Sequence, residues 1–196
     1  LSGTAEISAG GALALALAGR RSLSEEELLR QDQAARQADQ PFLPMQLHLL
    51  DNQLYCLRLD FLTLTELWRM PRDQVDLDRL TRALITLIHN HPMLRSVIRL
   101  DEDQGFVIHY DPDLPPVLEV IHTTEEEFRR GMDDLVRRFT LIGAPLYRFR
   151  IYETEESVYL HMGFNHLFND GYSLTVLFKN LSDAYHGRPL PHDYSY

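Results

Sequence analysis

The stretch VYLHMGFNHLFNDG, residues 158–171, decides how the rest of this chain is interpreted. Its first half is an apolar and aromatic run, which is typical of a buried strand. The residues that follow it place apolar side chains at helical spacing, namely Leu174, Leu177, Phe178, Leu181 and Tyr185. His166 and Asp170 therefore lie on a strand-to-helix loop, where rigid elements often present reactive side chains.

The composition limits what the chain can be. Its 196 residues are 44% hydrophobic, which is enough to form the core of one domain or of one lobe of a larger domain. The net charge of -10 disfavours nucleic acid and anionic membranes as partners. Cys56 is the sole cysteine, so an intrachain disulfide is impossible and a reducing cytoplasm is the expected compartment.

The first 22 residues are expected to be separate from the main unit. They begin without methionine and contain an alanine-rich run, residues 12–18, that is too short to span a bilayer. We interpret residues 1–22 as a linker, a remnant of an upstream region or a short added strand. No long linker divides residues 23–196, which we expect to form one unit.

The first half of that unit predicts helices and strands in alternation. Ser24 and Glu27 have the spacing of a capping box, and the helix they begin should end before Pro41. A strand is predicted over residues 54–67, and an amphipathic helix over residues 75–88. Residues 94–100 and 106–110 should form a hairpin around an acidic turn that contains glycine.

The second half predicts the sheet that carries the opening stretch. A strand is expected at residues 117–121, followed by a helix that begins with the capping box of Thr124 and Glu127 and buries one face as far as Phe139. Residues 146–153 alternate and should pair antiparallel with the strand that begins at Val158. The predicted fold class is α/β, a two-layer sandwich of helices on a mixed, largely antiparallel sheet.

His166 is the best candidate for a catalytic base. A free imidazole titrates near pH ~6.5, so it can take or give a proton at neutral pH. Asp170 could orient the ring, bind an arginine or cap the next helix. The sequence has no G-x-S-x-G elbow, P-loop or G-x-G-x-x-G motif, and its single cysteine gives no zinc pattern.

Four segments together resemble a known family. Residues 165–171, NHLFNDG, are similar to the H-H-x-x-x-D-G motif of condensation domains from nonribosomal peptide synthetases, which share the chloramphenicol-acetyltransferase-like fold. In the family's order, residues 43–46 resemble its "L-S-P-M-Q" segment, residues 90–95 its "R-H-x-x-L-R" segment and residues 144–148 its "P-L-x-R" segment. The resemblance extends from Pro41 to about Pro191.

The resemblance implies that residues 23–196 are the N-terminal lobe of a two-lobed domain with its active site in a tunnel between the lobes. His166 matches the catalytic histidine, which orients or deprotonates the amine that attacks a thioester. The substrates would be tethered by phosphopantetheine to donor and acceptor carrier proteins, with no intrinsic cofactor. The second lobe and an adjacent adenylation domain are the other expected partners, and the lobe alone should be inactive.

The same resemblance assigns supporting roles around His166. Asp170 matches a mainly structural carboxylate that pairs with an arginine, for which Arg95 is the first choice and Arg148 the second. Asn165 replaces the family's first histidine, whose role is to support the loop, and an asparagine can still donate and accept hydrogen bonds. Gly171 should lie near the substrate path, and the glycine allows close approach or a positive φ. Ser173 could offer a hydroxyl close to the substrate.

Three alternative functions follow from the same residues. Asn165 could mark a non-catalytic scaffold or carrier-protein binding module. The chain could also be an O-acyltransferase of the same superfamily that uses coenzyme A or a carrier-bound donor. A metal-dependent hydrolase using His161, His166 and Asp170 is the remote alternative, since the predictions otherwise place His161 in the surroundings of the sheet. For His89 and His91, at a helix end, a packing role is favoured over a metal pair.

Overall fold

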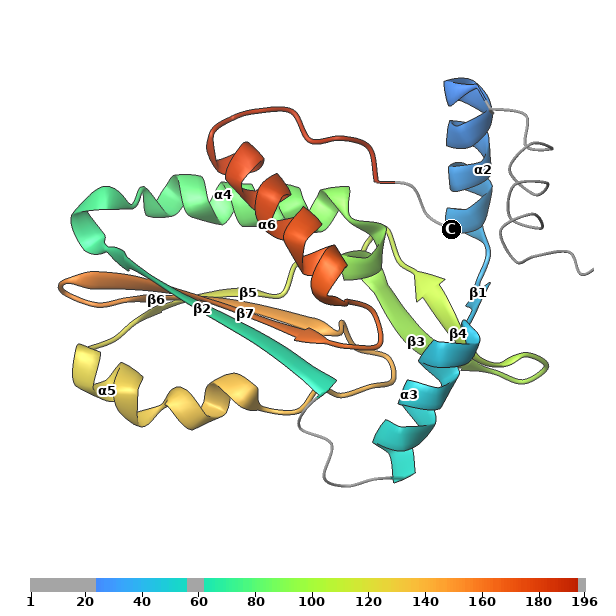
Figure 1. The fold of residues 1–196 in the computed structure, drawn as a ribbon, viewed down its shortest axis with the longest axis horizontal. Helices are drawn as coiled ribbons and strands as arrows, with labels where there is room; N and C mark the ends of the chain where they lie inside the picture. Colours follow the sequence, from blue (N-terminus) through green and yellow to red (C-terminus); the bar gives the residue numbers. More distant parts are fainter. Residues whose placement is uncertain (1–23, 56–61, 194–196) are drawn as a thin grey trace, which may run out of the picture.

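The computed structural model describes residues 24–55 and 62–193, and its centre is a four-stranded sheet (Figure 1). The strand order is β2-β7-β6-β5, with β2 (Thr63–Pro71), β7 (Ser157–Asn165), β6 (Tyr147–Glu153) and β5 (Leu118–His122). β7 pairs antiparallel with β2 and with β6, whereas β5 is parallel to β6. The mixed, largely antiparallel sheet and the β6–β7 hairpin predicted from the sequence are confirmed.

β7 is one of the two inner strands, and all nine of its residues are buried. Helices α4 (Leu77–Asn90) and α6 (Gly171–Tyr185) cover one face of the sheet (Figure 1). The short helix α5 (Glu125–Arg130) and the 3-10 helix η4 (Met132–Val136) lie against the opposite face. Because both faces are covered, β7 carries apolar side chains toward both faces and does not alternate regularly between apolar and polar residues.

α4 and α6 form the main core with the sheet. α4 buries one stripe of side chains, Leu80, Ala83, Leu84, Leu87 and Ile88. α6 adds Leu174, Leu177 and Leu181, and both helices pack with Leu160, Met162 and Phe164 of β7. The predicted amphipathic helices are confirmed, because their apolar spacing matches the face that a helix presents to a sheet.

A smaller sheet lies beside the main one. Its strand order is β1-β4-β3, with β1 (Gln40–Pro41), β4 (Gly105–Tyr110) and β3 (Ser96–Asp101). Gly105 closes the β3–β4 turn with a φ of 77°, a conformation that favours glycine. The predicted hairpin is confirmed, and a short 3-10 helix, η3 (Pro92–Arg95), joins α4 to β3.

Two helices begin with the predicted capping boxes. In α2 (Glu25–Gln37), the Ser24 side chain accepts from the Glu27 N–H while the Glu27 carboxylate accepts from the Ser24 N–H. Thr124 and Glu127 make the same reciprocal pair at α5. α5 is shorter than predicted, because Gly131 ends it and η4 continues the chain, so that Phe139 lies beyond both helices.

The strand predicted over residues 54–67 was partly wrong. Residues 44–55 form helix α3 (Pro44–Tyr55), and β2 begins only at Thr63 and continues through Trp68 to Pro71. Pro44 occupies the first helical position, where its missing N–H has no cost, and the Gln46 side chain accepts from the Leu43 N–H just before it. Residues 56–61, in the middle of the predicted strand, lie outside the described residues.

The small 3-10 helix η2 (Arg72–Gln74) connects β2 to α4. Over residues 24–55 and 62–193, none of the helices has the length and apolar character needed to cross a membrane. The linker or added strand predicted for residues 1–22 lies outside the described part of the chain.

Candidate active site

The loop that carries His166 is fixed at its base by both neighbours of β7. The Asn165 N–H donates to the Leu146 carbonyl at 2.8 Å, and the His166 N–H donates to the Leu62 carbonyl at 2.8 Å. The chain then turns, and the N–H groups of Phe168 and Asn169 both donate back to the Asn165 carbonyl. The backbone from β7 to α6 is therefore held by hydrogen bonds on both sides of His166.

The Asn165 carboxamide supports this loop from within. It donates to the Gln53 side chain at 2.8 Å and accepts from the Gln53 side chain at 3.2 Å, so the two amides form a closed pair. The Asn165 oxygen also accepts from the Leu167 N–H at 2.9 Å. Gln53, on α3, is a partner that the sequence did not indicate, because 112 positions separate the two residues.

Gln46 makes a second link between α3 and the loop. Its amide nitrogen donates to the Leu167 carbonyl at 3.1 Å, while its oxygen accepts from the Leu43 N–H. The sequence placed Gln46 in a family-like segment without giving it a role. In the structure, one side chain both begins α3 and holds the loop after His166.

His166 itself is half-buried, and its imidazole makes no hydrogen bond within residues 24–55 and 62–193. Its backbone is fixed while its ring nitrogens stay open to a substrate. A histidine in this position can accept a proton from an attacking group, provided that the group is delivered within hydrogen-bond reach.

Asp170 caps α6 and does not form the arginine pair expected for it. Its carboxylate accepts from the Ser173 N–H at 2.8 Å and from the Ser173 hydroxyl at 2.7 Å. These two hydrogen bonds hold the pKa of Asp170 below its usual range, and the nearby His166 acts in the same direction more weakly. Of the three roles proposed for this aspartate, the structure shows the helix cap.

Both arginines chosen as partners for Asp170 bind elsewhere. Arg95 donates to the Tyr110 hydroxyl at 3.4 Å, and its guanidinium lies 5.7 Å from the centre of that ring. Arg148 donates to the Arg137 carbonyl at 3.2 Å and lies over Phe139. The predicted pairing was wrong because the Asp170 side chain turns toward the first turn of its own helix.

Gly171 and Ser173 both belong to that first turn. Gly171 has an ordinary negative φ, so the positive φ considered for it is not needed, and a Cβ at this position would meet nothing within 4 Å. The open space beside it is compatible with the predicted substrate path. The Ser173 hydroxyl is engaged by Asp170, which makes it a member of the cap.

The histidines considered as metal ligands are dispersed. His161 is fully buried in β7, where burial, with smaller contributions from Arg150 and Arg148, lowers its pKa to about 4. His91 bonds Asp193 at 2.6 Å and Asn180 at 3.1 Å, so its predicted packing role fits. In the part of the chain that the structure describes, no group of three His, Cys, Asp or Glu side chains could hold a metal ion. His161, His166 and Asp170 therefore do not form such a group in the described structure.

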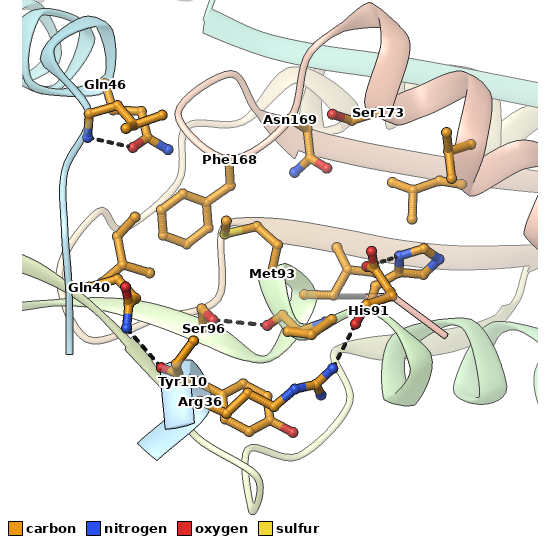
Figure 2. Close-up of a pocket in the computed structure, with 18 of the residues that line it drawn as sticks. Arg36, Gln40, Gln46, His91, Met93, Ser96, Tyr110, Phe168, Asn169 and Ser173 are labelled. Atoms are coloured by element: carbon orange, nitrogen blue, oxygen red, sulfur yellow. Dashed lines mark hydrogen bonds and ion pairs between the residues drawn. The ribbon is translucent and has the colours of Figure 1, made fainter. Parts of the chain in front are cut away.

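A pocket of about 430 Å³ lies beside the loop (Figure 2). Phe168, Asn169 and Ser173 contribute to its wall, but His166 does not. Asn169 lines this pocket and was not singled out from the sequence. No local pattern marks it, since it is one of the unspecified positions of the motif.

Solved structures show which fold this arrangement belongs to. The condensation domain of the monacolin K polyketide synthase MokA superposes with a TM-score of 0.70 at 15% identity, covering 80% of this chain and 36% of that one. The first condensation domain of the CDA synthetase gives 0.64 at 20% identity, covering 80% and 42%. The X-domain from teicoplanin biosynthesis gives 0.63 at 22% identity, covering 79% and 34%.

The described residues therefore have the chloramphenicol-acetyltransferase-like fold of these domains. The family model "Condensation domain" matches residues 69–195, and the chain belongs to the condensation-domain family.

Curated relatives agree with this assignment. Nonribosomal peptide synthetase 8 of Aspergillus fumigatus is 30% identical over 127 residues, which is 60% of this chain and 1% of that protein. Tyrocidine synthase 3 of Brevibacillus parabrevis is 29% identical over 120 residues, covering 60% and 2%. Gramicidin S synthase 2 of Brevibacillus brevis is 30% identical over 115 residues, covering 58% and 2%. The chain thus spans only a small part of these relatives.

Proposed function

We propose that residues 23–196 act as the N-terminal lobe of a condensation domain that forms amide bonds between acyl or aminoacyl thioesters tethered to carrier proteins. The observation that carries this proposal is the His166 loop, whose backbone is fixed on both sides while the imidazole stays unbonded among the described residues. Membership of the condensation-domain family supports the choice of reaction.

His166 would act on the attacking amine. As the amine nitrogen bonds to the thioester carbonyl carbon, the imidazole takes the amine proton, and the carbon–sulfur bond then breaks. The imidazolium returns this proton to the leaving sulfur, so the phosphopantetheine thiol of the donor carrier and the neutral His166 are regenerated, and the amide remains on the acceptor carrier. A general base placed in this way contributes roughly 10²- to 10⁴-fold to a rate.

Asn165 supports catalysis in this proposal rather than marking its loss. Its carboxamide is paired with Gln53 and bonded to the Leu167 N–H, so the loop keeps an internal support where the family has a histidine. These hydrogen bonds would keep the backbone of His166 in place with an asparagine at this position.

The partners follow from the same proposal. Donor and acceptor carrier proteins would deliver the two thioesters, and a second lobe would form the facing wall of the tunnel, since the chain covers 36% to 42% of two solved condensation-domain chains. An adenylation domain adjacent in the same synthetase is a further expected partner. The lobe by itself is therefore proposed to be inactive.

The test uses the full-length protein with both carriers loaded. His166→Ala should lower the single-turnover rate of amide formation by about 10²- to 10⁴-fold without changing the loading of either carrier. His186→Ala is the matched control, because this exposed histidine bonds only its own helix at the Ser182 carbonyl. Unchanged turnover in the His166 variant would remove the catalytic role.

A non-catalytic carrier-binding module is the second candidate, favoured by the departure at Asn165 from the family's first histidine. It predicts carrier binding with no amide product from the wild-type protein. Offering an amine and an alcohol acceptor together in the same assay also tests O-acyl transfer, because an ester product would favour that alternative.

A further inference from the structure

The pocket beside the loop is suited to a small organic molecule. Its volume of about 430 Å³ lies within the usual range for ligand sites, roughly 300–1,000 Å³. Segments far apart in the sequence meet there, from α2, β1, η3, β4 and α6 (Figure 2). Most of the lining is apolar, including Leu43, Met93, Ile108, Phe168, Val176 and Leu177.

The charged groups in the wall are already compensated. Arg36 donates to the Asp32 carboxylate at 2.8 Å and to the Asp193 carbonyl at 2.6 Å. The Asp193 carboxylate bonds the His91 ring at 2.6 Å. An ionised ligand would lose its hydration without finding a free opposite charge among the described lining residues, so the pocket favours an uncharged molecule.

Asn169 contributes an open carboxamide to the pocket. The residue as a whole is only 6% exposed, and its side chain makes no hydrogen bond with any described residue. Figure 2 shows its carboxamide in the pocket wall, opposite Met93. The carboxamide therefore lines the pocket without a hydrogen-bond partner among the described residues, and a ligand could supply one.

Two polar side chains near Asn169 are already engaged. The Ser173 hydroxyl donates to Asp170, and both ends of the Gln46 amide are engaged by backbone groups. The Asn169 N–H is bonded to the Asn165 carbonyl, so the backbone that carries the side chain is fixed. A carboxamide offers one donor edge and one acceptor edge, which another amide can match with two hydrogen bonds.

We propose that this pocket binds an uncharged, mainly apolar molecule that carries an amide, and that Asn169 recognises the amide by paired hydrogen bonds. Binding does not depend on the His166 chemistry, because His166 does not line the pocket. The identification of the ligand with a carrier-tethered acyl group rests on the proposed function, whereas the existence of the site does not.

The test is a titration of the whole 196-residue chain with 4-phenylbutanamide, followed by NMR of ¹³C-methyl methionine. The Met93 methyl lines the pocket, whereas Met132 is exposed on η4 and Met162 is buried in the main core, so these two serve as internal references. The amide should shift Met93 alone. 4-Phenylbutanoate, which is charged, and 5-phenylpentan-2-one, which has no donor, should each bind at least about tenfold more weakly.

Two variants separate recognition from folding. Asn169→Leu keeps the size of the side chain but removes its polar edge, and should weaken the amide about tenfold and the ketone, which has only one hydrogen bond to lose, by less. Ala35→Phe fills the pocket from α2 and should abolish binding of every probe. Gln33→Leu, on an exposed position of α2, is the control and should change nothing. Thermal unfolding of each variant shows whether it is folded.

Equal binding of amide, ketone and acid, or an amide affinity unaffected by Asn169→Leu in a folded protein, would overturn the proposal. So would shifts at Met132 or Met162 without a shift at Met93. N-acetylleucyl-pantetheine, with pantetheine alone as its control, then distinguishes the source of the ligand. Binding of the thioester that is tighter than binding of pantetheine supports a tethered acyl group in the pocket. Binding that is weaker than that of pantetheine supports a free amide. These results stay interpretable if the His166 test fails.

Discussion

Asn165 is 2% exposed at the end of β7, and its carboxamide closes a pair with Gln53 while it accepts from the Leu167 N–H. Asn165→Ala would leave the Gln53 amide and that N–H without partners. The free energy of unfolding in urea should fall by about 1–3 kcal/mol. In a double-mutant cycle with Gln53→Ala, the two losses should be less than additive, because either change breaks the same pair.

Asn52→Ala provides the control for this change. Asn52 lies one position before Gln53 on α3, and its side chain bonds only His48 of its own helix. Loss of this side chain should change the free energy of unfolding by no more than about 0.5 kcal/mol. Additive losses from Asn165→Ala and Gln53→Ala would show that the amide pair is not what stabilises the loop.

His161 should make the stability of the lobe depend on pH. Its ring nitrogens are buried without a hydrogen-bond partner in the described structure, and burial, reinforced by Arg150 and Arg148, lowers its pKa to about 4 from 6.5. The unfolded chain therefore binds the proton first as the pH falls. Stability should decline from about pH 6.5 and lose up to about 3 kcal/mol near pH 4.

His161→Leu tests this prediction without adding a polar group. At pH 7.5 the variant should be at least as stable as the wild type, because it buries no imidazole nitrogen without a hydrogen-bond partner. The difference in the free energy of unfolding should increase in favour of the variant at pH 5. Urea unfolding at both values gives the difference, and His186→Leu on the surface is the control. A pH dependence identical to that of the wild type would mean that His161 is not responsible for it.

At the scale of one element, Asp170 sets the start of α6. Asp170→Ala removes the side chain that accepts from the Ser173 N–H and should destabilise the protein by about 1 kcal/mol, whereas Asp170→Asn should lose only part of this. The pKa of Asp170 is lowered in the folded protein. The extra stability of the wild type over Asp170→Ala should therefore be complete above the ordinary carboxyl pKa, and it should disappear as the pH falls through the lowered pKa. Unfolding curves of both variants from neutral to acidic pH measure it.

Asp183→Ala is a useful comparison within α6. Its carboxylate binds Lys179 and Arg188 near the other end of the helix, where a negative charge interacts unfavourably with the helix dipole. If Asp170→Ala destabilised the protein no more than Asp183→Ala, the cap would not be the source of the Asp170 effect.

The elements that could be predicted from the sequence are those whose signals are local. The capping boxes at Ser24 and Thr124 depend on residues three positions apart, and both formed. The Asp170 partner could not be inferred in the same way, because an arginine 75 positions upstream and a serine three positions downstream compete for it. Asp170 binds the nearer group, Ser173, because ordering a serine three positions away costs little conformational entropy.

Helix α3 was missed for a related reason. Residues 44–55 carry no capping box, and their start is fixed by a glutamine side chain that also reaches the distant Leu167 carbonyl. Tertiary contacts therefore decide that this segment is helical, and its apolar residues alternate too loosely to distinguish a helix from a strand. The same holds for Gln53 and Asn169, whose partners or open space exist only once β7 and α6 are in place.

At the scale of the whole molecule, residues 191–193 connect α2 to the rest of the structure. The Asn90 side chain donates to the Pro191 carbonyl, and the Asp193 carboxylate bonds His91. From α2, Arg36 donates to the Asp193 carbonyl. α2 contributes only Asp32 to the buried residues, so polar contacts rather than a shared apolar core hold it in place (Figure 1). Such a helix should unfold locally at a lower free energy than the sheet.

Arg36→Met tests whether this network holds α2. The change keeps an apolar stem of similar length but removes the donor to both Asp32 and the Asp193 carbonyl, leaving the buried carboxylate with fewer partners. Hydrogen exchange of the α2 amides should accelerate about 10- to 100-fold, while the β7 amides keep their wild-type protection. Arg30→Met, which breaks only the exposed pair with Glu26, should leave both unchanged. Equal acceleration in α2 and β7 would show instead that α2 unfolds together with the core, and that these polar contacts stabilise the molecule as one unit.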